Sequence, residues 1–177
     1  MTITLKEFQE LSTRTAPFNA APENHIEKQN ILTNYTLGLN GEFIELELEN
    51  NSDFPSYSDE LIKEAGDVLH YAVVLLRVLN KKTTDESTGL KIVSKKNVKE
   101  SLGNTLEIIK KTYYHGHEFN EKEYVKSVKT VIDYIYDQLG EENFYIALER
   151  NIDKLKKRYP DGFSKESSIK RVDVEEK

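Results

Sequence analysis

Two stretches of the sequence repeat apolar residues at helical spacing and carry a pair of carboxylates inside that pattern. The first stretch contains Glu42 and Glu45, and the second contains Glu64 and Asp67. Residues three apart project from the same side of a helix, so each pair presents two oxygen ligands in one direction. Two such helices laid side by side would place four acids around one cavity. The pattern therefore predicts packed helices with a metal site between them.

The rest of the pattern predicts an all-α chain. Thr4 is placed to cap a short opening helix. Further helices are expected over about 23–50, 59–80, 95–114, 121–139 and 142–158. Turn chemistry at 50–58, a polar connector at 81–93 and Pro160-Asp-Gly162 separate or end these segments. We expect the charged tail over 165–177 to fray, and no segment has the pattern of a sheet.

These segments predict one domain, since 177 residues suit a single ordinary core. We expect that domain to cover residues 1–164 as a four-helix-bundle core built from two helical hairpins, with shorter flanking helices. The first hairpin spans about 24–80 and carries the acidic motifs. The second spans about 95–140, and a C-terminal helix follows over about 142–158.

The two hairpins are related by a weak internal repeat. At a constant offset of 63, residues 59–73 match 122–136 at four positions: Glu60 and Glu123, Lys63 and Lys126, Val68 and Val131, Tyr71 and Tyr134. Ser127 and Thr130 then take the places of Glu64 and Asp67, so the second copy lacks both of these acids. This pattern indicates a degenerate duplication. Chance agreement between two amphipathic helices is the alternative.

Composition excludes several classes of protein. The formal net charge of −6 and the pI near 5.4 argue against a nucleic-acid binder, which needs a dominant basic face. The absence of Cys excludes disulfides and thiolate zinc sites. No apolar run approaches 18 residues and the N-terminus lacks the regions of a signal peptide, so we expect a cytoplasmic protein without a membrane partner.

Several motifs together resemble a known family. The segments Leu37-Gly-Leu-Asn-Gly-Glu-Phe-Ile-Glu45 and Glu64-Ala-Gly-Asp-Val-Leu-His-Tyr71 look like the paired acidic motifs of the MazG-like, all-α nucleoside triphosphate pyrophosphohydrolases. The closing Asn151-Ile-Asp-Lys-Leu-Lys-Lys-Arg-Tyr-Pro-Asp-Gly-Phe163 resembles their C-terminal signature, and Arg14-Thr-Ala is similar to their N-terminal segment. The resemblance covers most of residues 3–164. It implies that the four carboxylates are the catalytic metal ligands, and that the chain assembles as a homodimer.

The chain departs from the usual single-hairpin pattern of that family. Simpler relatives carry two lysines and a His-Gly-His turn before the second acidic motif, whereas here these features are Lys110, Lys111 and residues 115–117 in the second half. On this alignment Ser101 and Asn104 stand where the first acidic pair would be. We interpret the chain as a fused pseudo-dimer in which both hairpins contribute to one site, so Lys110 or Lys111 would reach the substrate's phosphates.

The chemistry predicted for this site is phosphoanhydride hydrolysis. An all-oxygen ligand set favours Mg²⁺, with Mn²⁺ as a substitute, and Mg²⁺ commonly shares its coordination shell with substrate phosphates. A metal-bound water would attack the α-phosphorus of a nucleoside triphosphate, and pyrophosphate would leave. The products are a nucleoside monophosphate and pyrophosphate, with a deoxynucleotide as the expected substrate.

Five further residues are candidates for substrate binding. Lys154 and Arg158 lie four apart on the last predicted helix and can reach phosphate oxygens from one face. Tyr71 lies one turn beyond Asp67, where its ring could stack on a base or pack the cavity wall. Asn34 could hydrogen-bond a base edge. Asn151 could contact the site or act as a structural cap.

Other interpretations remain open at this point. Charged residues three apart are usually a solvated helix face, and a purely structural helical module is compatible with that pattern. A protein that binds metal and nucleotide with weak or no turnover would also carry these motifs. Two histidines flanking a glycine, His115 and His117, are more often loop residues than metal ligands.

Overall fold

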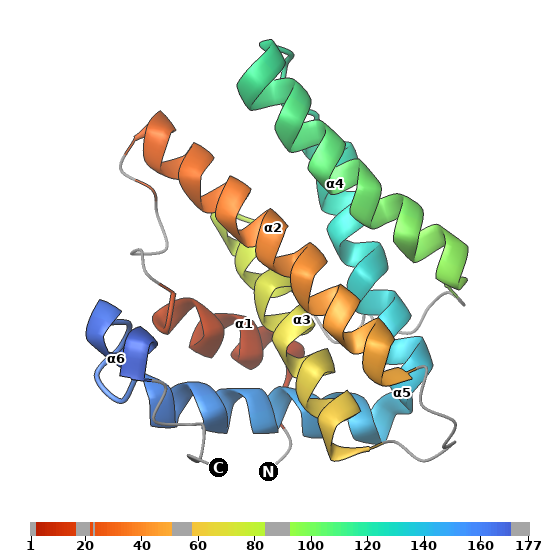
Figure 1. Cartoon of the computed structure of the whole chain (residues 1–177), viewed down its shortest axis with the longest axis vertical. Coiled ribbons are helices and arrows are strands. Elements are labelled where there is room, and N and C mark those ends of the chain that lie inside the picture. Colours follow the sequence, from red (N-terminus) through yellow and green to blue (C-terminus); the bar gives the residue numbers. More distant parts are fainter. Residues whose placement is uncertain (1–2, 17–21, 23, 51–57, 84–92, 171–177) are drawn as a thin grey trace.

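The computed structural model describes residues 3–16, 22, 24–50, 58–83 and 93–170, and every regular element in these ranges is an α-helix (Figure 1). The helices are α1 Leu5–Arg14, α2 His25–Asn50, α3 Asp59–Val78, α4 Lys95–His115, α5 Glu121–Arg158 and α6 Lys165–Lys170. The predicted all-α class is confirmed. None of the helices in these ranges is both long enough and apolar enough to span a membrane.

The helix starts follow from capping side chains. Thr4 accepts a hydrogen bond from the backbone of Glu7, whose carboxylate accepts one from the Thr4 backbone in return, which is a complete capping box. Ser58, Ser94 and Asn120 cap α3, α4 and α5 in the same general way. Each of these caps satisfies a backbone N–H group of the first turn and so fixes where its helix begins.

Helix α5 contains a corner at Gly140. This residue has φ 69° and ψ 168°, a conformation outside the helical region that is essentially restricted to glycine. The predicted break between helices at 121–139 and 142–158 lies at this position. Figure 1 shows the chain changing direction there, so that residues 141–158, the distal segment of α5, run below the other helices.

Helix α3 occupies the centre of the molecule. It packs against α1, α2 and α5, and residues 72–76 are fully buried on every side. The distal segment of α5 packs closely against α3 at Gly66. A Cβ added there would lie 2.8 Å from the carbonyl oxygen of Ala147 and 3.0 Å from Cβ of Asn151, so only glycine fits. This close contact brings the distal segment to the acidic motif of α3.

The two hairpins share a local feature at the predicted repeat. Lys63 pairs with Glu60 at 3.0 Å in α3, and Lys126 pairs with Glu123 at 3.4 Å in α5. The duplication and its arrangement as a regular four-helix bundle remain predictions. The chain also continues into α6, a short helix within the segment that we expected to fray, and residues 171–177 lie outside the described ranges.

Candidate metal centre

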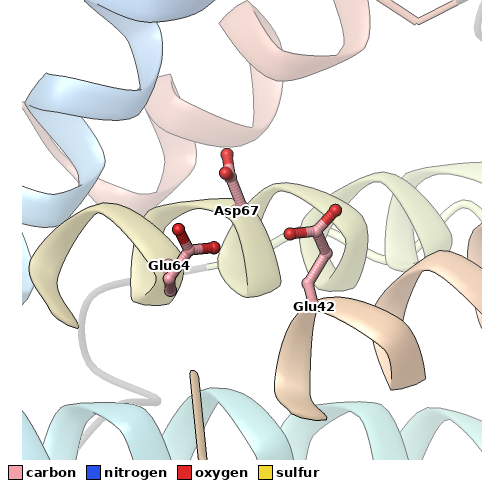
Figure 2. A group of neighbouring side chains, drawn as sticks. All are labelled: Glu42, Glu64 and Asp67. Carbon is pink, nitrogen blue, oxygen red and sulfur yellow. The ribbon is translucent and has the colours of Figure 1, made fainter. Parts of the chain in front are cut away.

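Three of the four predicted carboxylates converge. Oxygens of Glu42 on α2 and of Glu64 and Asp67 on α3 all lie within 4.8 Å of one another. Figure 2 shows Glu64 and Asp67 on one helix and Glu42 extending toward them from the neighbouring helix. In the described ranges this is the one group of acids or histidines close enough to hold a metal ion, and it is called the acidic cluster below.

Glu45 lies beside the acidic cluster and is not part of it. Its side chain is exposed, whereas Leu46 next to it is buried in the core. Glu42 and Glu45 are three apart, as are Glu64 and Asp67, so helical spacing alone does not separate Glu45 from the cluster; the rotation of α2 against α3 directs Glu42 toward α3 and leaves Glu45 exposed. Its negative charge nevertheless contributes to raising the pKa of Glu42.

The acidic cluster disfavours the ionised form of Glu42. Partial burial is the largest cause, and the charge of Asp67 is the next; together with the other nearby acids they raise the pKa of Glu42 to about 7. Lys154 acts in the opposite direction and lowers it. The cluster therefore carries like charges that its own surroundings neutralise only in part.

The distal segment of α5 supplies the direct partners of Asp67. Asn151 donates a hydrogen bond from Nδ2 to Oδ1 at 2.6 Å, and Nζ of Lys154 lies 2.5 Å from both carboxylate oxygens. Nζ of Lys63 lies 3.1 Å from Oε1 of Glu64. Asn151 is 4% exposed, and its Oδ1 is buried without a hydrogen-bond partner. An amide oxygen of this kind is available to a ligand or a water molecule.

Aromatic side chains form one wall of the acidic cluster. The ring of Tyr71 covers Gly38 of α2 so closely that a Cβ there would lie 2.2 Å from ring carbon Cε1. Tyr71 also packs against Tyr35 and His70, with ring centroids 5.2 and 5.5 Å apart. Burial and the charge of Glu42 raise the pKa of Tyr71 to about 12. Tyr71 thus packs the wall of the site, and stacking on a base remains a prediction.

His70 was not among the predicted site residues. Burial lowers the pKa of its imidazole to about 4, and Nδ1 is buried without a hydrogen-bond partner. The ring is therefore neutral and lies 6.2 Å from that of Tyr35. Its position three residues after Asp67 was the signal available in the sequence.

A hollow of about 440 Å³ lies beside this aromatic wall, along the first half of α2. It is lined by Asn24, Ile26, Glu27, Asn30, Ile31, Asn34 and Tyr35. Tyr35, the lining residue nearest to the acidic cluster in sequence, precedes Glu42 by seven residues, so the near end of the hollow is about 10 Å from Glu42 along the helix axis. Asn34 was predicted to contact substrate and lines the hollow. Asn30 was missed, although its spacing of four residues from Asn34 places both amides on one face.

The remaining predicted residues differ in their surroundings. The positive charge of Arg158 acts on Tyr71 and His70, and its guanidinium lies 6.0 Å from the ring centroid of Tyr159. In the described ranges Lys110 and Lys111 both pair with Glu107 on their own helix, and neither joins the acidic cluster.

The packing of the second hairpin explains why Lys110 and Lys111 lie apart from the acidic cluster. Helix α4 packs on α5 and α2, whereas two of the three carboxylates are on α3. Among the residues that the structure describes, no contact therefore supports the proposed role of Lys110 and Lys111 at the substrate's phosphates.

Comparisons with protein-family models, with curated proteins and with solved structures found no match to this chain. The resemblance to the MazG-like pyrophosphohydrolases therefore remains a prediction, and function has to be argued from the site itself.

Proposed function

We propose that this protein is a Mg²⁺-dependent nucleoside triphosphate pyrophosphohydrolase that releases a nucleoside monophosphate and pyrophosphate. The observation that carries the proposal is the convergence of Glu42, Glu64 and Asp67 within 4.8 Å, from two helices that are separate in sequence. The cleavage of the bond between the α and β phosphates follows the family resemblance. The site geometry supports the broader class of metal-dependent phosphoanhydride hydrolysis.

The residues present fit a hard divalent cation. All the candidate donors are oxygens, which Mg²⁺ and Mn²⁺ prefer. Burial and then the neighbouring negative charges raise the pKa of Glu42, and the orphaned Oδ1 of Asn151 lies on the residue that contacts Asp67. Glu42, Glu64 and Asp67 would hold the ion, with Glu45 at the margin. A bound ion would supply an acidified water and neutralise phosphate charge.

The chain's own groups would bind and orient the substrate. Lys154 and Arg158 are one helical turn apart and present two cations to the same side of the distal segment, where phosphate oxygens could contact both. Asn151 holds Asp67 in place through its hydrogen bond. Tyr71 packs beside the acidic cluster, where its ring would bound one side of the substrate.

The hollow beside the cluster is the proposed site for the nucleoside. Asn30 and Asn34 both line it, and amide side chains can donate to and accept from a base edge. Asn34 precedes Glu42 by eight residues, about 12 Å along the axis of α2, a distance that a nucleoside triphosphate could span from the hollow to the carboxylates. An Asn34→Ala variant should therefore change the preference among bases more than it changes metal binding.

The first experiment is chromatography of the products formed from each common ribo- and deoxynucleoside triphosphate, with Mg²⁺ and with excess chelator. We expect monophosphate and pyrophosphate with metal only, and a loss of at least about 100-fold in Asp67→Asn. Glu60→Gln removes an exposed acid from the same helix and is the matched control. Diphosphate and orthophosphate as products would refute the proposed cleavage position.

The second candidate function is nucleotide and metal binding without turnover. The observation that favours it is the ion pair in which Lys154 engages both oxygens of Asp67. Equilibrium binding of a nucleotide that depends on metal, with no product formed from any nucleotide tested, would support this second candidate.

A further inference from the structure

The ion pair between Asp67 and Lys154 is an integral part of the acidic cluster. The ammonium lies 2.5 Å from each oxygen of the carboxylate, and the two side chains are only 15% and 19% exposed. Asn151 donates to the same Oδ1. Both oxygens of Asp67 are therefore engaged in a largely desolvated, charge-assisted contact.

A divalent cation held by the cluster would need the oxygens that Lys154 engages. An ammonium and a metal ion cannot share one carboxylate at these distances without strong repulsion in a partly buried site. We infer that Lys154 is a built-in counter-cation of the metal-free site, which leaves Asp67 when a divalent cation binds and transfers to the phosphates of the substrate. This inference rests on the proposed function.

Lys154 is placed to make this exchange. Its ammonium is carried on a flexible four-carbon stem, and the following turn carries Arg158, so both cations can contact one polyphosphate. The charges that face Lys154 from α2 and α3 are the carboxylates Glu42, Glu64 and Asp67. Release of its ammonium to solvent or to a phosphate leaves these acids free to ligate.

The exchange links cation binding to nucleotide binding. Without nucleotide, cation binding requires the loss of a buried ion pair, and this cost weakens it. With nucleotide, the displaced ammonium gains a phosphate partner. Each ligand should therefore strengthen the other by the same factor, because coupling between two sites is reciprocal.

Lys63 provides a matched comparison for Lys154. It contacts Glu64 at 3.1 Å, but its side chain is 50% exposed and it also pairs with Glu60. Removing Lys63 deletes the same charge from the same cluster. A cation should displace Lys63 from Glu64 at little cost in free energy, since exposed ion pairs contribute little to stability.

The test is calorimetric titration of Mn²⁺ into the full chain without nucleotide. Lys154→Met should bind Mn²⁺ between about 5-fold and 150-fold more tightly than the wild type, the usual range for coupled sites. Lys63→Met should change the affinity by less. In an Asp67→Asn background, Lys154→Met should change the affinity by a smaller factor than it does in the wild type, because the ion pair is already absent. Lys154→Gln, which keeps more polarity, is titrated in parallel, with folding checked by circular dichroism.

The possible failures are distinguishable. Clear Mn²⁺ binding by the wild type with equal or weaker binding by Lys154→Met would refute the counter-cation and leave the proposed function intact. Absence of Mn²⁺ binding by the folded wild type and by both Lys154 variants would refute the metal centre itself. An equal gain in Lys63→Met would mean that Lys154 acts only through its overall charge, which also contradicts the inference.

Discussion

Glu42 links the stability of the folded chain to pH. Its pKa in the folded state is about 7, compared with the ordinary value of 4.5, because burial and neighbouring negative charges disfavour ionisation. Between these two values the folded state retains a proton that the unfolded state has lost. The contribution of Glu42 to stability is therefore fully present below about pH 4.5 and is lost as the pH rises through about 7.

Glu42→Gln should remove this dependence. In the presence of chelator at pH 8, we expect the variant to be more stable than the wild type by about 1 to 2 kcal/mol, a value reduced from full linkage because solvent screens a partly exposed group. At pH 4.5 the difference should be small. Urea unfolding followed by circular dichroism at both pH values measures it, with Glu60→Gln as the control. Equal stability of wild type and Glu42→Gln at pH 8 would contradict the prediction.

At the residue scale, sequence spacing could predict that Glu64 and Asp67 share a helix face, since this depends only on helical geometry. The convergence of Glu42 and the separation of Glu45 depend on how α2 is rotated against α3. That rotation is set by apolar residues such as Phe43 and Leu46, which are buried in the core. The position of a side chain at the edge of a buried stripe cannot be derived from spacing alone.

At the element scale, the contact between α3 and the distal segment of α5 determines whether the site is complete. It brings Asn151 and Lys154 to Asp67, and it requires glycine at position 66 because the carbonyl of Ala147 lies so close. The backbone of one helix therefore sets the distance of the other, and the hydrogen bonds to Asp67 depend on that distance.

Gly66→Ala should separate these two helices. We expect it to lower the free energy of unfolding by about 1 to 3 kcal/mol, as is typical of overpacking, and to weaken Mn²⁺ binding. Gly103→Ala is the matched control, because nothing lies within 4 Å of its added Cβ in α4, and it should stabilise by up to about 1 kcal/mol. Urea unfolding of both variants tests the pair. If Gly66→Ala left the free energy of unfolding unchanged, α3 and the distal segment of α5 would be able to move apart at no cost, which would contradict the prediction.

Most element boundaries were predictable, and their packing was not. Capping at Thr4, apolar periodicity and the glycine at position 140 are local signals, so the helices and the corner in α5 follow from short stretches of sequence. The path of the distal segment after that corner depends on contacts with α3, about 80 residues earlier in the chain. The pairing of Lys110 and Lys111 with Glu107 is local, at spacings of three and four residues within α4. The packing of α4 on α5 and α2, away from the helix that carries Glu64 and Asp67, is the part that short stretches of sequence do not encode.

At the scale of the whole molecule, the apolar residues left exposed suggest how a second copy could associate. Leu37, Ile44 and Leu48 are 58%, 61% and 68% exposed, and their spacings of seven and four residues place them in one row on α2. Isolated exposed apolar residues are common on proteins, but an aligned row offers a contact surface. The homodimer predicted from the family resemblance would bury this row, next to Glu45.

Ile44→Glu should therefore shift the chain toward the monomer. A charge in the middle of the row would have to be desolvated on association, which weakens the contact by about 10-fold or more. Light scattering after size-exclusion chromatography, over a 100-fold range of concentration, measures the mass of each species. Ile169→Glu is the control, because Ile169 is 83% exposed on α6 and outside the row. A wild type that remains monomeric throughout, or a dimer unaffected by Ile44→Glu, would rule out association through this face of α2.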